Sequence, residues 1–557
     1  MIMGHSMNRD RSIRKLAALS CMMALPVVLF SGQERERLIT SEAEPNILLI
    51  WTDQQIFGML SCEGNQYIET VNLDRLAKEG AMFQNAFTTL PSCSPTRATI
   101  VSGLYVHNHR LYDNIDPSIG MEGIKPLDGF KITEQYLSEA GYAIGHRGKW
   151  HAGEKADWGA AFTADEDFSE KYSPLWDRLH KQAVKAQYPW DRTTRTGAGG
   201  YTMGKLDLPI RQTPSWQKAF DNGKMPSWAI VGETLIPAEM LMETGVVESV
   251  MDFIEANKEG PWMATLSLSP PHDPWNVPEP YYSEIAKPLM DQMQIVGNGD
   301  PQQQRSSLSW RTGQLVDDRG IQEYMAIYHA QVYMMDEMIG RVLDQLDVLG
   351  IADNTLVVFT SDHGDMVGMH RNVGKINNNL YNRLYHVPFL VRYPNQVSAG
   401  QVIDAPVMLT DVMPTFMDYA GIELERAVDG MSIRPLLENE PVEWRDYHLL
   451  EKFMNTTRNA DHSVKNMSDF YWVMGLEDGR FKYLCPRFND KDHNKKYSPP
   501  RFIDLKNDPL EENNLFENSD YRKLVEQYHA KLQRVLVESN FEFMDQFPED
   551  PWSERSK

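Results

Sequence analysis

Cys93 and Arg97 are the most informative pair of residues in the chain. They belong to the run Cys93-Ser94-Pro95-Thr96-Arg97, in which a thiol beside a proline turn is followed closely by a guanidinium group. This arrangement is suited to chemistry on an anion. The alternative is an inert cysteine buried in a tight turn, since most free cysteines are buried.

Two apolar segments lead directly into side chains that bind metals. Residues 46–51 precede Asp53-Gln54, and residues 355–360 precede Asp362-His363. Continuous apolar runs predict buried parallel strands, and ligands bind beyond the C-terminal ends of such strands. A single aspartate at a strand end is more often a helix cap. Because the pattern occurs twice, it predicts a metal site with three oxygen donors and one nitrogen, which favours Ca²⁺ and leaves Mn²⁺ open.

Basic and proton-transferring residues are expected beside this site. The candidates are Arg97, Lys149, His151, His272 and Lys375. Lys149 and His151 alternate, so on an extended segment both side chains face the same way. Taken singly, Lys149 is also consistent with a solvated surface lysine and His272 with a turn residue held between prolines.

The order of these motifs resembles the formylglycine-dependent sulfatases of the alkaline phosphatase superfamily. The resemblance extends from about Asn46 to Leu515. The segments that carry it, besides residues 93–103, are Asn72–Ala77, Gly141–Gly153, Pro271–Pro274, Asp362–Lys375 and Leu505–Leu515.

The resemblance implies that Cys93 is converted to formylglycine by a maturation enzyme. Its hydrate, bound to the metal together with Asp53, Gln54, Asp362 and His363, is the nucleophile that attacks sulfur and forms a covalent sulfated intermediate. The second hydroxyl of the hydrate then allows sulfate to be expelled, which a serine ester could not do.

The same resemblance implies roles for the basic residues. Arg97 and Lys149 hold the hydrate and lower the pKa of its hydroxyls. His272 and Lys375 bind the sulfate oxygens and protonate the departing alkoxide, while His151 removes the proton of the second hydroxyl. Lys149, His272 and Lys375 are thus the expected substrate-binding residues.

Two positions depart from the commonest family pattern. Gln54 replaces an aspartate, as in subgroups that include choline sulfatases and phosphonate monoester hydrolases, and this leaves metal identity and the preference for sulfate or phosphate open. Ser102 replaces a threonine and keeps its hydroxyl.

The remaining elements predict the fold. Helical periodicity over residues 71–80, 131–140 and 321–349 alternates with strand signals such as residues 263–269. This alternation predicts an α/β fold, a three-layer αβα sandwich around a large mixed, mostly parallel sheet. Residues 45–440 form the expected catalytic domain. Short strands within residues 471–505 and a helix over 521–538 predict a smaller C-terminal α+β domain with a short antiparallel sheet, residues 441–557.

One long segment, residues 157–228, has no clear period. Its aromatic residues either stack on sugar rings or fill a satellite core. They are Trp158, Trp176, Trp190, Tyr201 and Trp216.

The net charge and the N-terminal sequence indicate which partners are excluded and where the protein works. The net charge is −23 with a pI near 5.1, which argues against bulk capture of nucleic acid or an acidic membrane. Four basic residues and the apolar run Leu16–Phe30 predict a signal peptide over residues 1–32, and hence export to the periplasm, the extracellular space or the cell surface without stable membrane insertion after cleavage. The alternative is an N-terminal anchor that is retained. Pairing of Cys62 with Cys485 is left open.

These observations favour an exported enzyme that hydrolyses O-sulfate esters of a sulfated polysaccharide or oligosaccharide. The alternatives are a phosphonate or phosphate diester hydrolase, or an aryl or choline sulfatase, on the same scaffold. A protein that binds a sulfated glycan without catalysis, with Cys93 left as a thiol, is the rival from another class.

Overall fold

The central sheet of the computed structural model contains seven strands in the order β11-β2-β10-β9-β1-β7-β4. The structure describes residues 44–115, 129–152, 210–222, 230–298, 316–375, 380–455, 470–486 and 500–552. Four neighbouring strands run parallel: β9 (Thr355–Ser361), β1 (Asn46–Thr52), β7 (Trp262–Ser267) and β4 (Ala143–Gly148). The antiparallel strand β10 (Phe389–Arg392) joins them to β2 (Ala81–Phe83), and β11 (Gln401–Ile403) lies at the edge. The prediction of a mixed, mostly parallel sheet is confirmed.

Strand β1 shows why its sequence is apolar throughout. Leu48 and Ile50 pack into the core on one face of the sheet, whereas Ile47, Leu49 and Trp51 pack into a second core on the other. Successive side chains of a strand point to opposite faces, so a strand covered on both sides needs an apolar residue at every position.

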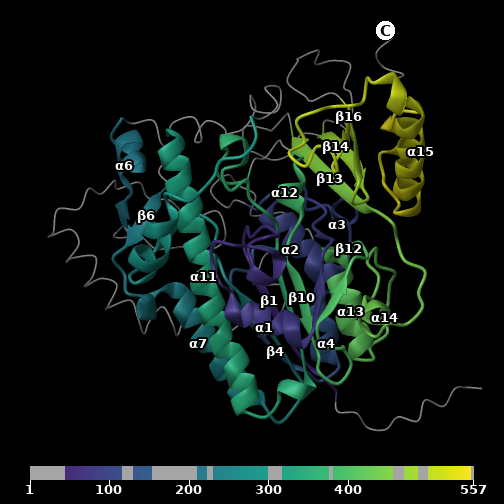
Figure 1. Cartoon of the computed structure of the whole chain (residues 1–557). Coiled ribbons are helices and arrows are strands. Elements are labelled where there is room, and N and C mark those ends of the chain that lie inside the picture. Colours follow the sequence, from purple (N-terminus) through teal and green to yellow (C-terminus); the bar gives the residue numbers. More distant parts are fainter. Residues whose placement is uncertain are drawn as a thin grey trace, which may run out of the picture. The chain divides into compact units, whose positions relative to one another are not determined.

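Helices cover both faces of this sheet (Figure 1). Helices α1 (Val71–Glu79), α7 (Met242–Asn257) and α11 (Asp318–Val348) contribute to the core that contains Leu48. Helices α2 (Cys93–Ser102), α4 (Thr133–Glu139) and α13 (Val412–Tyr419) contribute to the core that contains Leu49. The three-layer sandwich is therefore confirmed. Shorter elements are β3 (Ala86–Phe87), α3 (Val106–His109), α8 (Lys287–Leu289), α12 (Asn382–Tyr385), β12 (Val407–Met408) and α14 (Arg434–Leu437).

The C-terminal region contains the expected antiparallel sheet. Its strands are β13 (His448–Asn455), β14 (Phe470–Glu477), β15 (Phe481–Pro486) and β16 (Arg501–Asp504). Helix α15 (Arg522–Glu538) packs on it through Val525, Leu532 and Leu536. Strand β13 was not predicted. The domain boundary at residue 440 stays a prediction, because residues 44–557 form one compact unit.

The segment that lacked a period forms part of a second, three-stranded sheet. Strands β5 (Ile210–Gln212), β6 (Val231–Thr234) and β8 (Trp275–Val277) pair beside helix α6 (Pro214–Asp221). Trp216 on α6 is fully buried, and its indole donates to the Gly320 carbonyl at 2.7 Å, so it is a core residue. The other four aromatic residues of the segment lie outside the described residues.

Some predictions about the N-terminus and the cysteines can be compared with the structure. The predicted signal peptide lies outside the described residues. Among the helices that are described, none has the length and apolarity to cross a bilayer. Cys62 and Cys485 are both free thiols and are not joined to each other.

Candidate active site

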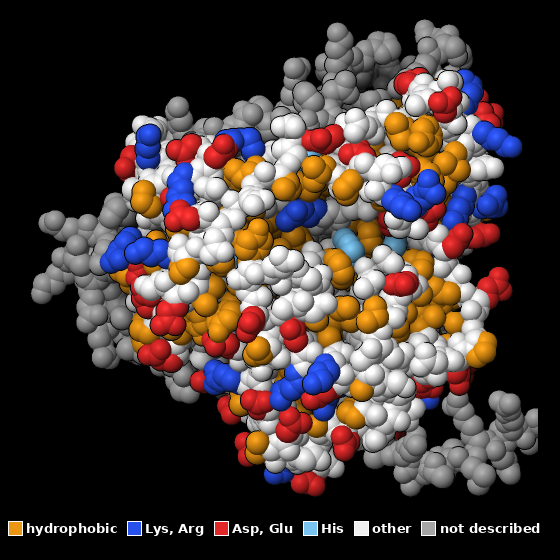
Figure 2. Space-filling model, viewed as in Figure 1, with side chains coloured by type: hydrophobic (Ala, Val, Ile, Leu, Met, Phe, Trp, Pro, Cys, Tyr) orange, Lys and Arg blue, Asp and Glu red, His pale blue; other side chains and the backbone are white. Residues whose placement is uncertain are grey.

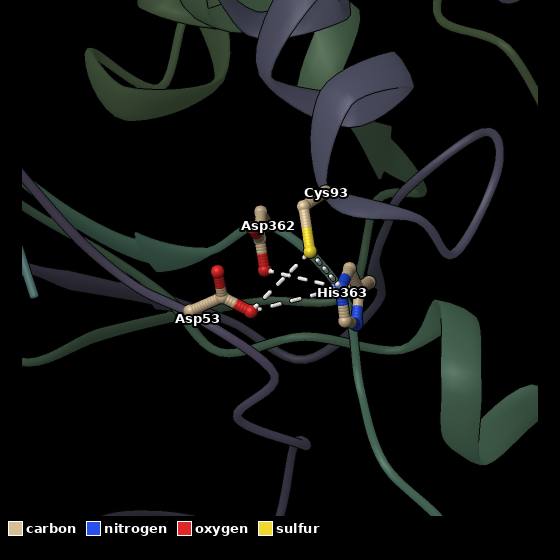
Figure 3. A group of neighbouring side chains, drawn as sticks. All are labelled: Asp53, Cys93, Asp362 and His363. Carbon is tan, nitrogen blue, oxygen red and sulfur yellow. Dashed lines mark hydrogen bonds and ion pairs between the residues drawn. The ribbon is translucent and has the colours of Figure 1, made fainter. Parts of the chain in front are cut away.

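Asp53, Cys93, Asp362 and His363 converge at the C-terminal edge of the central sheet. Figure 3 shows the four side chains pointing toward one another, and their ligand atoms all lie within 4.8 Å of one another. The Cys93 sulfur is 3.3 Å from His363 Nε2 and 3.6 Å from Asp53 Oδ1. All four residues are buried.

The strand register brings the two acidic residues together. Strands β1 and β9 are parallel and pair Thr52 with Ser361, so the residues that follow each strand emerge side by side. The Gln54 backbone N–H donates to Asp362 Oδ1 at 3.0 Å, and Gln54 has a φ of 75°. A non-glycine residue rarely adopts this left-handed conformation, so the sharp turn after β1 is held by the surrounding contacts.

The Gln54 side chain supplies evidence that a cation belongs here. Its Nε2 donates to Asp365 Oδ2 at 2.5 Å, and Asp365 also accepts from the Tyr324 hydroxyl. Its Oε1 is buried and has no hydrogen-bond partner within the described part of the chain. A buried amide oxygen without a partner is costly. Together with the carboxylates of Asp53 and Asp362 it fits a hard divalent cation.

Arg97 links the carboxylates of Asp53 and Asp362 to the rest of the site. Its guanidinium donates to Asp362 Oδ2 at 2.9 Å, Asp53 Oδ2 at 3.2 Å, the Lys149 carbonyl at 2.6 Å and the Ser267 hydroxyl at 2.9 Å. Arg97, Asp53 and Asp362 are all fully buried. Separation of a buried ion pair would leave an uncompensated charge, which is strongly destabilising, so the partners stay together. Arg97 therefore positions both carboxylates.

The positive charges determine the ionisation of Asp53. Burial and the negative charge of Cys93 oppose ionisation, but Lys149, His272 and Arg97 outweigh them and hold the pKa of Asp53 well below its usual value. The Lys149 ammonium donates directly to Asp53 Oδ2. Asp53 is therefore ionised, as a metal ligand must be.

Cys93 begins helix α2 and faces a group of cations. The Lys375 ammonium lies 2.8 Å from the Cys93 sulfur and 3.2 Å from His272 Nε2. Burial raises the pKa of the Cys93 thiol, but Lys149, Lys375 and His363 more than reverse this and bring it well below its usual value. An anionic group at position 93 is therefore favoured.

His151 and His272 differ in protonation. Burial lowers the pKa of His151, so its ring is neutral near pH 7. His151 Nε2 donates to the Ile115 carbonyl at 2.9 Å, which leaves the lone pair on Nδ1. Burial opposes protonation of His272 too, but Asp273 raises the pKa of His272 above its usual value. One histidine is thus suited to accept a proton and the other to donate one.

The structure brings all of the predicted site residues together and adds others. Ser267 contacts Arg97, Asp365 holds the Gln54 amide, and Asn114 Oδ1 accepts from the Ser94 backbone N–H at 3.0 Å. Ser267 ends strand β7 at the same sheet edge, a signal that could have identified it. No sequence pattern marked Asn114. The Ser102 hydroxyl donates to the Ala98 carbonyl at 2.6 Å in the last turn of α2.

The positive charge of the site is local. Over the face shown in Figure 2, lysine and arginine side chains are interspersed with aspartate and glutamate and do not form one broad patch. Arg97, Lys149 and Lys375 nevertheless gather at the site, although the chain as a whole has a net charge of −23.

Comparisons with known proteins agree with this geometry. A family model described as Sulfatase matches residues 45–422, and one described as N-sulphoglucosamine sulphohydrolase, C-terminal, matches residues 375–538. An N-acetylglucosamine-6-O-sulfatase of Bacteroides thetaiotaomicron is 28% identical over 534 residues, which cover 91% of this chain and 88% of that protein.

Two solved structures share the fold. A phosphonate monoester hydrolase of Agrobacterium radiobacter superposes with a TM-score of 0.69 at 22% identity, over 89% of this chain and 96% of that one. A protein crystallised with D-glucosamine-2-N,6-O-disulfate superposes with a TM-score of 0.61 at 21% identity, over 90% and 99%. Since the Sulfatase model matches more than half of the sequence, the chain belongs to the sulfatase family and is a sulfuric ester hydrolase.

Proposed function

We propose that this protein is an exported sulfatase that hydrolyses O-sulfate esters of a sulfated polysaccharide or oligosaccharide and releases inorganic sulfate. The observation that carries the proposal is the contact of Lys375 with both Cys93 and His272 beside a buried Asp/Cys/Asp/His group. The relative named N-acetylglucosamine-6-O-sulfatase, which matches along most of both chains, supports a carbohydrate substrate.

Conversion of Cys93 to formylglycine by a maturation enzyme is part of the proposal. The hydrated aldehyde supplies a nucleophilic oxygen and a second hydroxyl that permits release of sulfate. The low pKa of the Cys93 thiol supports this, because the cations that favour a thiolate also favour an ionised hydrate at the same position.

A divalent cation, Ca²⁺ or alternatively Mn²⁺, would be held by Asp53, Gln54, Asp362, His363 and the group at position 93. When bound, it polarises the sulfate oxygens and favours the ionised nucleophile. The unpartnered Gln54 Oε1 and the oxygen-rich donor set support this assignment.

The chain's own side chains perform the remaining steps. Lys375 and protonated His272 bind the sulfate oxygens, and His272 protonates the leaving alkoxide. Lys149 adds positive charge beside Asp53, and Arg97 keeps both carboxylates aligned. Neutral His151 accepts a proton on Nδ1 as sulfate leaves.

Export follows from the predicted signal peptide, residues 1–32, and would bring the enzyme to the periplasm or cell surface, where sulfated glycans are encountered. The signal is tested by N-terminal sequencing of the mature protein from cell fractions. A full-length protein that stays in the cytoplasm contradicts this part of the proposal.

The central test combines mass spectrometry with a substrate panel. The protein is co-expressed with a formylglycine-generating enzyme, and the Cys93 peptide is expected to have the lower mass of the aldehyde. C93A is expected to lose activity on sulfated oligosaccharides, whereas C62A, which removes a cysteine outside the site, is expected to keep it. A Cys93 peptide that stays a thiol would instead support a glycan-binding protein.

Comparison of an aryl sulfate with an aryl phosphonate separates the remaining scaffold alternatives. Faster turnover of the phosphonate, or turnover of small aryl or choline esters without any saccharide, contradicts the proposed substrate class.

A further inference from the structure

Lys452 is a buried lysine in the C-terminal sheet that the mechanism above does not use. It lies on β13, paired with Val473 of β14, and is 7% exposed. Leu449 and Phe453 pack on the face of this sheet that α15 covers. Leu450 packs on the opposite face. Because side chains alternate along a strand, Lys452 shares the face of Leu450.

That face is turned toward the segment that carries Lys375. The apolar cluster that includes Leu450 and Val473 also contains Met366 and Met369, which precede Lys375, and Leu380 and Tyr381, which follow it. The Glu451 backbone N–H donates to the Thr89 carbonyl at 2.7 Å, so β13 also lies against the loop that leads into Cys93. Lys452 is thus on the active-site side of the C-terminal sheet.

Asp113 lies in the segment that follows helix α3. The neighbouring Asn114 accepts from the Ser92 hydroxyl at 2.9 Å and from the Ser94 backbone N–H at 3.0 Å, which fixes this loop beside the first turn of α2. The charges of Asp113 and Lys375 both act on the pKa of Lys452.

The ammonium of Lys452 is poorly compensated. Within the described residues it has no hydrogen bond and no carboxylate within the 4.0 Å of an ion pair. Burial lowers the pKa of Lys452. The negative charge of Asp113 raises this pKa, whereas repulsion by Lys375 lowers it further. A buried charge without a hydrogen-bonded partner destabilises the protein by itself. Such an arrangement favours an anionic ligand that compensates both charges.

We propose that Lys452 is a specificity-determining residue that binds a second anionic group, a sulfate or a carboxylate, on the substrate whose reacting sulfate ester lies against Lys375 and His272. The inference rests on the proposed carbohydrate sulfatase function. It narrows the substrate to a saccharide that carries two negative groups, one bound by Lys375 and His272 and the other by Lys452.

The test uses the mature protein and pairs of sulfated saccharides that differ by one anionic group. In one set of pairs the extra group is a second sulfate, and in the other it is a uronate carboxylate, so the two sources are distinguished. The ratio of kcat/KM within each pair is measured for the wild type, K452M and K531M. Lys531 is a control on α15 that pairs with Asp446 at 2.8 Å.

The wild type is expected to prefer the doubly charged member of at least one pair. K452M is expected to reduce that preference by about 10- to 100-fold, the value of a charge-assisted contact, whereas K531M is expected to retain it. Thermal unfolding provides a second readout. K452M is expected to raise the unfolding midpoint, because methionine removes a buried and poorly compensated charge.

Several results would overturn the inference while leaving the sulfatase assignment intact. These are a wild type that turns over saccharides without preference for the second charge, a K452M variant that keeps the preference, or one with a lower unfolding midpoint. If the mature wild type releases sulfate from no saccharide, the proposed function itself fails.

Discussion

The substitution D365N tests whether Asp365 sets the orientation of the Gln54 amide toward a cation. Asp365 is fully buried and accepts from Gln54 Nε2 at 2.5 Å, from the Val367 backbone N–H at 2.7 Å and from the Tyr324 hydroxyl. An ionised carboxylate can only accept hydrogen bonds, so the Gln54 amide must turn its nitrogen, and not its oxygen, toward Asp365. Gln54 Oε1 is therefore turned the other way, without a protein partner.

The expected effect can be worked out from these contacts. Asparagine has one acceptor oxygen and brings an NH₂ group of its own, so it cannot satisfy all three donors. The Gln54 amide then either loses its hydrogen bond or rotates and withdraws its oxygen from the cation. A hydrogen bond to a charged group contributes about 1.5–3 kcal/mol. This corresponds to Ca²⁺ affinity that is about 10- to 100-fold weaker, the usual cost of losing an outer contact of a metal site.

The measurement is calorimetric titration of Ca²⁺ into protein stripped with a chelator, with circular dichroism as a check on folding. D336N is a matched control, because Asp336 also accepts three hydrogen bonds, from Asn72 and Leu73, and lies on α11 away from the site. D336N is expected to bind Ca²⁺ like the wild type. If D365N also binds with unchanged affinity, Asp365 does not orient the Gln54 amide and the reasoning is refuted.

Three further predictions concern charge and burial. R97K keeps the positive charge but cannot reproduce the forked contacts to Asp53 and Asp362, so kcat on a sulfate ester should fall by at least about 100-fold; activity within a few fold of wild type in steady-state assays would contradict the positioning role. Burial raises the pKa of Glu134 from 4.5 to about 7, so the folded protein retains this proton more tightly than the unfolded chain, and stability is lost as the pH rises through that range. The loss in the free energy of unfolding is about 3 kcal/mol. Because glutamine does not ionise, E134Q should show a smaller drop in unfolding midpoint than the wild type between about pH 5 and about pH 8. An equal drop in the wild type and E134Q would exclude Glu134 as the cause. Chelation should lower both the unfolding midpoint and the sulfatase activity, and Ca²⁺ should restore them, because a ligand bound only to the folded state stabilises it; full activity after exhaustive chelation would argue against a required cation.

Much of the scaffold could be predicted from local patterns. Strands β1 and β9 are buried on both faces, so each has a continuous apolar run, and parallel strands that end in Asp53 and Asp362 must present them at the same sheet edge. Helix α11 was predicted over 321–349 from its apolar stripe and is observed as Asp318–Val348. In these two strands and this helix, the positions of apolar residues in the sequence match the positions that are buried in the structure.

Strand β13 shows where local patterns are insufficient. Leu449 and Leu450 belong to different apolar clusters on the two faces of the sheet, and the next two residues are the buried charges Glu451 and Lys452. Adjacent charged residues are normally read as a solvated segment. Glu451 is instead satisfied by Val106 and His107, which lie more than three hundred positions away in the sequence.

The sequence by itself determined the types of chemical groups and the edge of the sheet at which most of them would meet, because strand burial and strand ends leave a local, periodic record. Only the tertiary structure decided how they interact: that Arg97 bridges two carboxylates, that Asp365 turns the Gln54 amide, and that the strand carrying Lys452 packs against the segment carrying Lys375. Gln54 and Asp365 are separated by 311 positions and Arg97 and Asp362 by 265. Periodicity reports that a residue is buried but carries no information about which distant side chain it meets.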